Sequence, residues 1–79
     1  MSAMLEVLYV APVDASREAR ILDVVASYGG TQSFRELPNE LGESRAICLT
    51  FEFSTREMSE LAAQELRRNG EHVEGPSDY

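Results

Sequence analysis

The order of hydrophobic patterns along the chain is the strongest constraint on its fold. Short apolar runs rich in β-branched residues alternate with longer stretches in which apolar residues recur at helical spacing. The order is strand, helix, strand, followed by strand, helix, strand. The four expected strands are Met4–Ala11, Thr31–Leu37, Arg45–Phe53 and Glu71–Gly75. The sequence therefore predicts two consecutive strand–helix–strand units.

The two helical segments carry their own start and stop signals. Asp14 or Ser16 can cap the first helix, and Gly29-Gly30 ends it. Ser54 and Glu57 have the spacing of a capping box for the second helix, and Gly70 ends it. The residues expected to face the core recur at helical spacing, and they are Ile21, Leu22, Val25 and Tyr28 in the first helix and Met58, Leu61, Ala62 and Leu66 in the second.

Two such units with right-handed crossovers give a ferredoxin-like βαββαβ sandwich of the α+β class. We expect a four-stranded antiparallel sheet in the order 4-1-3-2 and two helices on one of its faces. The opposite face would be open. Residues 1–75 would form a single domain, with Pro38–Ser44 as a turn-rich connection and residues 76–79 as a disordered tail.

The alternation within the strands decides which residues the open face presents. In the third strand one side carries the expected core residues Ile47, Leu49, Phe51 and Phe53. The first strand is ambiguous because Glu6, Leu8 and Val10 share a side, so either Leu8 and Val10 are core or the alternation is reversed. We choose the first arrangement. It predicts an apolar interaction face without a basic rim, made of Val7, Tyr9, Phe34, Ala46 and Cys48.

Composition limits the classes of partner and the location. Fourteen Asp and Glu against seven basic residues give a net charge of −7, which opposes attraction to phosphate backbones. All seven basic residues are arginines, so lysine Schiff-base chemistry is excluded. The single Cys48 and the lack of a signal peptide pattern predict a cytoplasmic protein, and no segment suits a membrane. Because a core this small rarely yields more than about 3–5 kcal/mol, we expect a homodimer or a protein partner.

Few residues suggest catalysis or metal binding. His72 lies beside Glu71 and near Glu74, and such a histidine can bind a metal or move protons. One histidine, one cysteine and no repeated ligand spacing favour an exposed edge histidine instead. A catalytic Cys48–His72 pair would need a base within reach of an activated thiolate, and Cys48 is more simply a small sheet residue. We therefore expect no metal, no cofactor and no enzymatic activity.

Four short pieces of the chain carry a family likeness, and they are Leu8-Tyr9-Val10, Tyr28-Gly29, Ser44–Phe51, and Asn69-Gly70 with Val73-Glu74-Gly75. Together they resemble the RNA-recognition-motif family. The resemblance implies the same fold and binding of single-stranded RNA, whose bases that family stacks on aromatic rings of the open face. Tyr9 matches one ring position, and Ala46 and Cys48 stand at the other two. Nucleic-acid binding through Tyr9, Arg35 and Arg45 is thus the first alternative function.

The expected fold is also that of the ACT family of amino-acid sensors, in which the turn after the first strand contacts a ligand at a subunit interface. The corresponding turn here is Pro12-Val13-Asp14, which lacks a glycine for close approach of a ligand. Small-ligand sensing at a dimer interface is the second alternative. Our first expectation is a non-enzymatic interaction or regulatory module that contacts itself or another protein through the open face.

Overall fold

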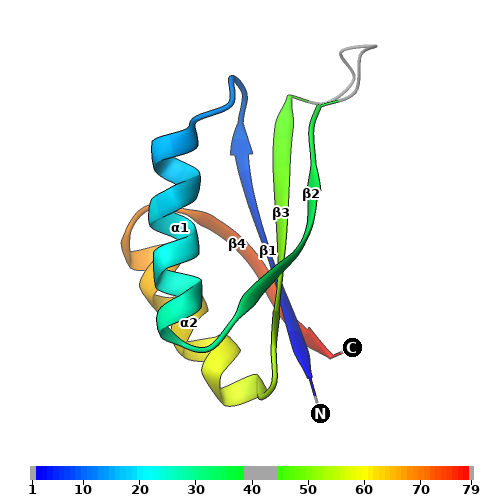
Figure 1. Ribbon diagram of the computed structural model, residues 1–79, viewed down its shortest axis with the longest axis vertical. Helices are drawn as coiled ribbons and strands as arrows, with labels where there is room; N and C mark the ends of the chain where they lie inside the picture. Colours follow the sequence, from blue (N-terminus) through cyan, green and yellow to red (C-terminus); the bar gives the residue numbers. More distant parts are fainter. Residues whose placement is uncertain (1, 39–44, 79) are drawn as a thin grey trace.

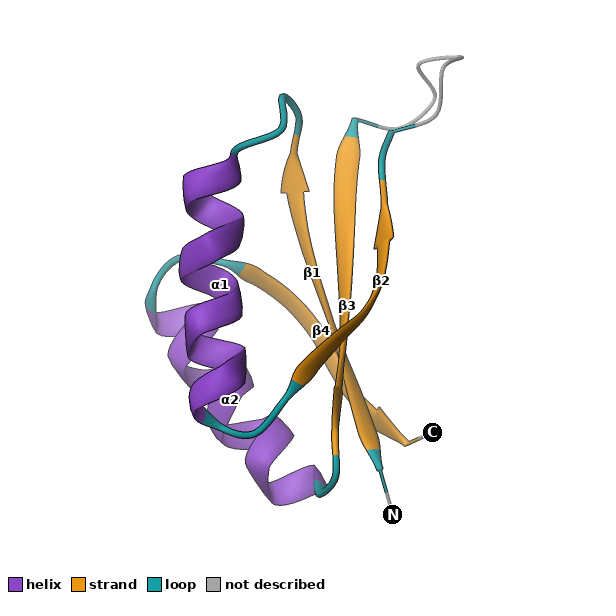
Figure 2. Cartoon of the chain, viewed as in Figure 1, coloured by secondary structure: helices purple, strands orange, loops and turns teal. Residues whose placement is uncertain are grey.

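Six elements make up the part of the chain that the computed structural model describes, residues 2–38 and 45–78. In chain order they are β1 (Ala3–Val10), α1 (Ala15–Ser27), β2 (Thr31–Glu36), β3 (Ala46–Phe53), α2 (Arg56–Arg68) and β4 (His72–Asp78). The element order expected from the sequence is confirmed (Figures 1 and 2). The expected turn-rich connection Pro38–Ser44 lies, apart from Pro38, outside the described residues.

The sheet has four antiparallel strands in the order β2-β3-β1-β4, which confirms the strand order expected from the sequence. Both helices lie on the same side of this sheet (Figure 1). The central pair, β1 and β3, is in register from Ala3 opposite Phe53 to Val10 opposite Ala46. The chain is therefore an α+β protein, and its strand order is consistent with a ferredoxin-like arrangement.

The core lies between the helices and the covered face of the sheet. The inward positions of β3 are Ile47, Leu49, Phe51 and Phe53, as the alternation predicted. Those of β1 are Ala3, Leu5, Val7 and Tyr9, each at most 4% exposed. Removing such side chains from water contributes about 1.5–3 kcal/mol for each fully buried large one, so this layer is the main source of stability.

The choice made for β1 from the sequence is wrong, because its alternation is the reverse of the expected one. Val7 and Tyr9 point into the core, while Val10 is 67% exposed on the other side of the sheet. The physical reason is Glu6, which shares a side with Leu8 and Val10. Burying that side would take a carboxylate out of water at a cost of several kcal/mol, whereas the observed alternation leaves Glu6 partly exposed and buries Val7 and Tyr9 in place of Leu8 and Val10.

The helices pack with some of the expected residues and some others. Ile21 and Val25 of α1 are buried as expected, whereas Leu22 is 39% exposed. In α2 the expected core residues Met58 and Leu61 are 42% and 39% exposed. The buried residues of this helix are Ser59, Ala62, Ala63 and Leu66. Small side chains on this stripe let α2 approach a sheet whose inward positions already hold two phenylalanines.

The start of one helix differs from the sequence prediction in one detail. Asp14 caps α1, and its carboxylate accepts the N–H of Arg17 at 3.0 Å. The capping residue of α2 is Thr55, not Ser54, and its hydroxyl accepts the N–H of Met58 at 3.2 Å. The capping signal was thus placed one residue early, because two adjacent hydroxyl residues precede the helix.

The last strand is longer than the sequence suggested. β4 continues through Gly75 to Asp78, so the expectation of a disordered tail from residue 76 is wrong as far as Asp78, and Tyr79 lies outside the described residues. Gly75 makes this extension sterically feasible. Its φ is +104°, and a Cβ there would lie 2.9 Å from the carbonyl oxygen of Met4. Only glycine fits this irregular point in the β1–β4 pairing, between Met4 and Glu6.

Candidate functional site

The face of the sheet opposite the helices is the candidate site, and we call it the open face. Strand alternation and register assign its positions: Met4, Glu6, Leu8 and Val10 of β1, Phe34 and Glu36 of β2, Ala46, Cys48, Thr50 and Glu52 of β3, and His72 and Glu74 of β4. Of the five residues predicted from the sequence, Phe34, Ala46 and Cys48 lie here. Val7 and Tyr9 do not, because they are buried under the helices. Leu8 and Val10 take their place.

An apolar strip crosses the open face from β1 to β2. Val10 lies opposite Ala46, and Leu8 lies opposite Cys48. Phe34 lies opposite Thr50, which is two residues further along β3 than Cys48. Val10 and Phe34 are 67% and 57% exposed. We define the apolar strip as Leu8, Val10, Phe34, Ala46 and Cys48. It joins three neighbouring strands into one surface that a partner can contact.

Carboxylates lie next to the apolar strip on its β2 and β4 sides and further along β3. Glu36 is opposite Cys48 on the β2 side, Glu6 is opposite Glu74 on the β4 side, and Glu52 lies further along β3. Across the described strands no arginine occupies an open-face position, and His72 is the sole residue there that can become a cation. Arg35, on β2, bonds Glu18 of α1 and thus points toward the helices. The open face is therefore apolar along the strip and negative on its β2 and β4 sides.

Cys48 is a protonated thiol at neutral pH. Burial, followed by the hydrogen bond to Glu6, raises the pKa of Cys48 to about 11. Its Sγ donates to Oε2 of Glu6 at 3.3 Å. His72 is no partner for this thiol, since both residues flank Leu8 from opposite neighbouring strands and their backbones are thus about 10 Å apart. The two residues considered as a catalytic pair are not brought together.

The carboxylates near His72 in the sequence do not gather around it. Nε2 of His72 is 3.5 Å from Oε1 of Glu74, and both side chains are well exposed. Glu71 instead accepts two hydrogen bonds from Nε of Arg17 and one from its Nη2, the shortest at 2.8 Å. Among residues 2–38 and 45–78, no three His, Cys, Asp or Glu side chains are placed to hold a metal ion.

Tyr9 belongs to a polar cluster between the sheet and the start of α1. Its hydroxyl donates to the Glu18 carboxylate and accepts the N–H of Asp14 at 3.0 Å. Arg35 binds Glu18 through two hydrogen bonds, of 2.8 and 3.1 Å. The guanidinium of Arg17 lies 4.9 Å from the centre of the Tyr9 ring. We call these residues, with Glu71, the Tyr9 cluster. The Tyr9 ring is enclosed and is not presented for base stacking on the open face.

The electrostatics of the Tyr9 cluster follow from its contacts. The hydrogen bonds from Arg35 lower the pKa of Glu18, and the bond from Tyr9 acts in the same direction. Burial raises the pKa of Tyr9, and the negative Glu18 adds to that rise. At neutral pH the cluster thus holds the ionised Glu18 carboxylate, the neutral Tyr9 phenol and guanidinium groups that are paired with carboxylates. Sequence reasoning missed it, because its partners are distant in the chain.

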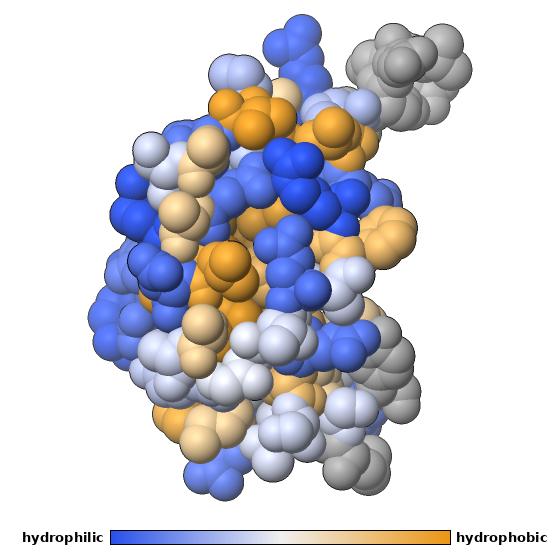
Figure 3. Space-filling model, in the orientation of Figure 1, coloured by the Kyte–Doolittle hydropathy of each residue, from blue (hydrophilic) through white to orange (hydrophobic). Residues whose placement is uncertain are grey.

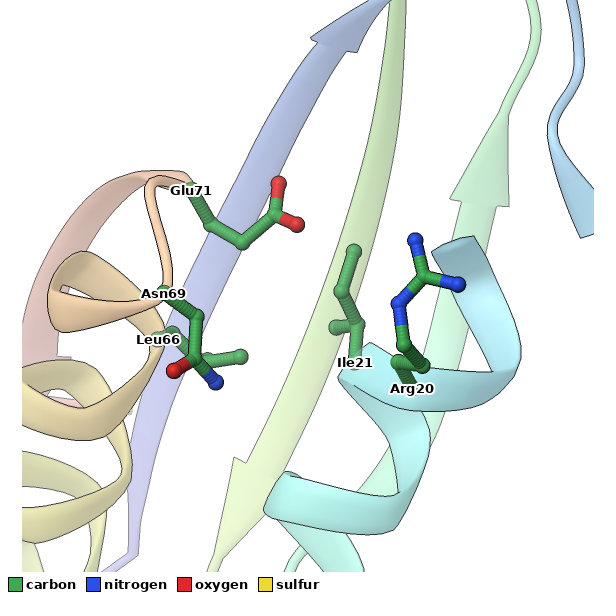
Figure 4. Close-up of a pocket in the computed structure, with 5 residues that line it drawn as sticks. All are labelled: Arg20, Ile21, Leu66, Asn69 and Glu71. Atoms are coloured by element: carbon green, nitrogen blue, oxygen red, sulfur yellow. The ribbon is translucent and has the colours of Figure 1, made fainter. Parts of the chain in front are cut away.

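A hollow of about 310 Å³ lies between α1 and the C-terminal end of α2. Figure 4 shows its lining residues: Arg20, Ile21, Leu66, Asn69 and Glu71. Ile21 and Leu66 are buried and form its apolar floor. The Glu71 carboxylate is already bonded by Arg17. None of its five lining residues has a hydroxyl or thiol group, so the hollow offers no nucleophile beside a base.

A second hollow, of about 330 Å³, lies between α1 and β2 and includes Val13 of the turn considered for ligand sensing. Its charged residues, Glu18 and Arg35, are paired with each other. Val13 and Leu22 contribute exposed apolar surface.

On the face shown in Figure 3, hydrophobic residues reach the surface in separate areas among hydrophilic ones. This side of the molecule thus offers scattered apolar contacts.

Neither described helix is long and apolar enough to cross a membrane. Comparison of the sequence with protein-family models and curated proteins, and of the fold with solved structures, found no match.

Proposed function

We propose that this chain is a non-enzymatic protein-interaction or regulatory module, a single ferredoxin-like domain that contacts its partner through the open face. A cytoplasmic location is part of the proposal and rests on the composition and the single cysteine. The partner side chains would pack on the apolar strip, whose members come from three adjacent strands. The raised pKa of Cys48 and its separation from His72 support binding rather than catalysis.

The apolar strip, in which Val10 and Phe34 are exposed and the other members are half-buried, is the observation that carries the proposal. Val10 and Phe34 are more than half exposed on a small acidic protein in which most other surface residues are polar or charged. Neither side chain is needed to fill the core, which lies on the other face of the sheet. Exposed apolar surface of this kind is typical of contact sites on other proteins. Fixed strands hold it in place, so a partner meets a surface that is already formed.

Site-specific photo-crosslinking in cells tests the proposal. A benzoylphenylalanine at Thr50 lies within the open face, whereas the same residue at Asp23 lies on α1 as a control. We expect defined protein adducts from Thr50, absent from Asp23 and lost when Val10→Ser and Phe34→Ser are combined. Because both side chains are exposed, this variant should stay folded. Adducts that form equally from α1, or that survive the double substitution, would contradict the proposal.

The two alternatives stay predictions. RNA binding rests on the motif resemblance, and its support is weaker now that Tyr9 is enclosed and carboxylates lie on two sides of the apolar strip. Titration with single-stranded oligonucleotides at low salt would reveal it as amide shifts on β1 and β3 that vanish at high salt. Ligand sensing at the Pro12-Val13-Asp14 turn has less support, because the Asp14 carboxylate already caps α1. It predicts thermal stabilisation by amino acids.

A further inference from the structure

Charge is unequally divided between the two layers of the molecule. Five of the seven arginines lie in α1 or α2, and Arg35 bonds Glu18 on α1. The strands place Glu6, Glu36, Glu52 and Glu74 on the open face. The helical layer therefore carries most of the positive charge, while the open face has none at its described strand positions except a protonated His72.

Two of these carboxylates are uncompensated. No described residue forms a hydrogen bond or an ion pair with the carboxylate of Glu36 or Glu52. Glu6 accepts from the neutral thiol of Cys48, and Glu74 approaches only His72. Carboxylates without an internal partner can pair with cations of another molecule, and these two lie on β2 (Glu36) and further along β3 (Glu52).

This pattern discriminates between classes of occupant. A second copy docked through the same face would set these carboxylates against one another, because a two-fold interface places identical patches together. Nucleic acid and anionic membrane surfaces are repelled for the same reason. A cationic partner is attracted at long range and can then bury its apolar side chains on the strip.

The width of the strip indicates the shape of the partner. It covers β1, β3 and β2, which is two strand spacings or about 10 Å, close to the diameter of an α-helix. A helix lying there would have Glu36 of the outer strand β2 along one border, and Glu6 of β1 with Glu74 of the next strand β4 along the other. Such a helix needs apolar residues along one stripe and Lys or Arg along both borders of that stripe.

We propose that the open face binds a basic amphipathic helix of another protein. This inference rests on the proposed function and adds the chemistry of the partner to it. The apolar strip receives the hydrophobic stripe of the helix, and Glu36, Glu52 and Glu74 receive its flanking cations. Binding is therefore stronger at low salt and selective for positively charged helices.

Three designed helical peptides of equal length test the charge rule on the intact protein. They share one leucine stripe and carry Lys, Gln or Glu at the flanking positions. Affinities are measured by fluorescence anisotropy, and the contact surface is mapped by amide chemical shifts. We expect the Lys peptide to bind most tightly, the Glu peptide not to bind, and shifts on the open-face strands. Equal binding of the Glu peptide, or shifts confined to the helices, would overturn the inference.

A pair of charge-matched variants separates local from overall charge. Glu36→Gln with Glu52→Gln removes two carboxylates from the open face, and Asp23→Asn with Glu57→Gln removes two exposed ones from the helices. The first pair should weaken Lys-peptide binding by about 2- to 30-fold, because each exposed ion pair contributes modestly, and the second by less than about twofold. Equal effects of both pairs would mean attraction by net charge alone and would overturn the inference.

The proposed function and this inference can fail separately. If Val10→Ser with Phe34→Ser abolishes binding of the Gln peptide as well as the Lys peptide while Glu36→Gln with Glu52→Gln has no effect, the face binds proteins and the charge rule is wrong. A homodimer in sedimentation that the same Val10 and Phe34 substitutions dissociate would also overturn the inference and keep the proposed function. If those substitutions change no binding at all, both are wrong.

Discussion

Replacing Tyr9 with phenylalanine tests how α1 is attached to the sheet. The Tyr9 hydroxyl donates to Glu18 and accepts the N–H of Asp14 at 3.0 Å, and the side chain is only 4% exposed. Phenylalanine keeps the ring, its packing and its contact with the Arg17 guanidinium, 4.9 Å from the ring centre. The substitution therefore removes two hydrogen bonds and changes little else.

The expected loss follows from the partners that remain. A hydrogen bond to a charged group contributes about 1.5–3 kcal/mol and a neutral one about 0.5–1.5 kcal/mol. The loss falls below the sum, because Arg35 still binds Glu18 through two hydrogen bonds and the exposed Asp14 can be hydrated. We expect the free energy of unfolding to drop by about 1–2.5 kcal/mol. For a domain of this length, each kcal/mol lowers the melting temperature by about 4–8 °C.

Urea unfolding followed by circular dichroism measures this loss, with Tyr28→Phe as the matched control. The Tyr28 hydroxyl donates to Glu65 at 2.8 Å between the two helices, in a more exposed setting. Its removal should cost less than about 1 kcal/mol. In a double-mutant cycle, Tyr9→Phe and Glu18→Gln should show a coupling of about 1 kcal/mol. If Tyr9→Phe costs no more than the control, or the coupling is absent, the hydroxyl does not secure α1 and our reasoning is wrong.

Three further predictions concern packing and titration. Gly30→Ala should destabilise the fold by about 1–3 kcal/mol in urea unfolding, because the alanine Cβ would lie 2.5 Å from the Phe53 ring. An unchanged free energy of unfolding would show that the ring moves freely. The pKa of Glu18 is lowered in the folded protein, so its contribution to stability is present above its ordinary pKa of 4.5 and is lost as pH falls through the lowered value. Glu18→Gln should therefore reduce the loss of unfolding free energy at acid pH, measured by unfolding at several pH values. Cys48, with a pKa of about 11, should react slowly with iodoacetamide at neutral pH. Glu6→Gln should speed the reaction by lowering that pKa, and an unchanged rate would contradict the thiol–carboxylate contact.

The sequence was sufficient for the strand order and for one of the two central strands. β3 alternates large apolar residues with small or polar ones, so only one of its sides can be core. β1 is apolar on both sides except at Glu6, and the outcome depended on the position of that single carboxylate. Counting the cost of a buried charge before counting apolar side chains would have given the observed side. That reasoning would also have moved Val7 and Tyr9 from the candidate site into the core.

Other features depend on contacts that no local pattern encodes. The Tyr9 cluster joins Arg35 to Glu18, 17 positions apart, and Arg17 to Glu71, 54 positions apart. Neither pair has helical or strand spacing. The buried stripe of α2 was predicted only in part: Ala62 and Leu66 are buried as expected, but the large residue Met58 is exposed while the small Ala63 is buried. Helical periodicity gives a stripe of apolar residues, but the space left above the sheet decides whether large or small ones lie inside.

The buried position of Tyr9 and the negative charge of the open face have the same cause. Successive strand residues point to opposite faces, so solvating Glu6 places Leu8 and Val10 beside it and sends Val7 and Tyr9 inward. Because Tyr9 points inward, its hydroxyl lies where α1 begins, which allows its bonds to Glu18 and Asp14. Because Glu6 points outward, it adds a carboxylate beside the apolar strip. A substitution such as Glu6→Val would therefore remove charge from the proposed binding surface and also weaken the preference for this alternation, so binding and stability should change together at this one position.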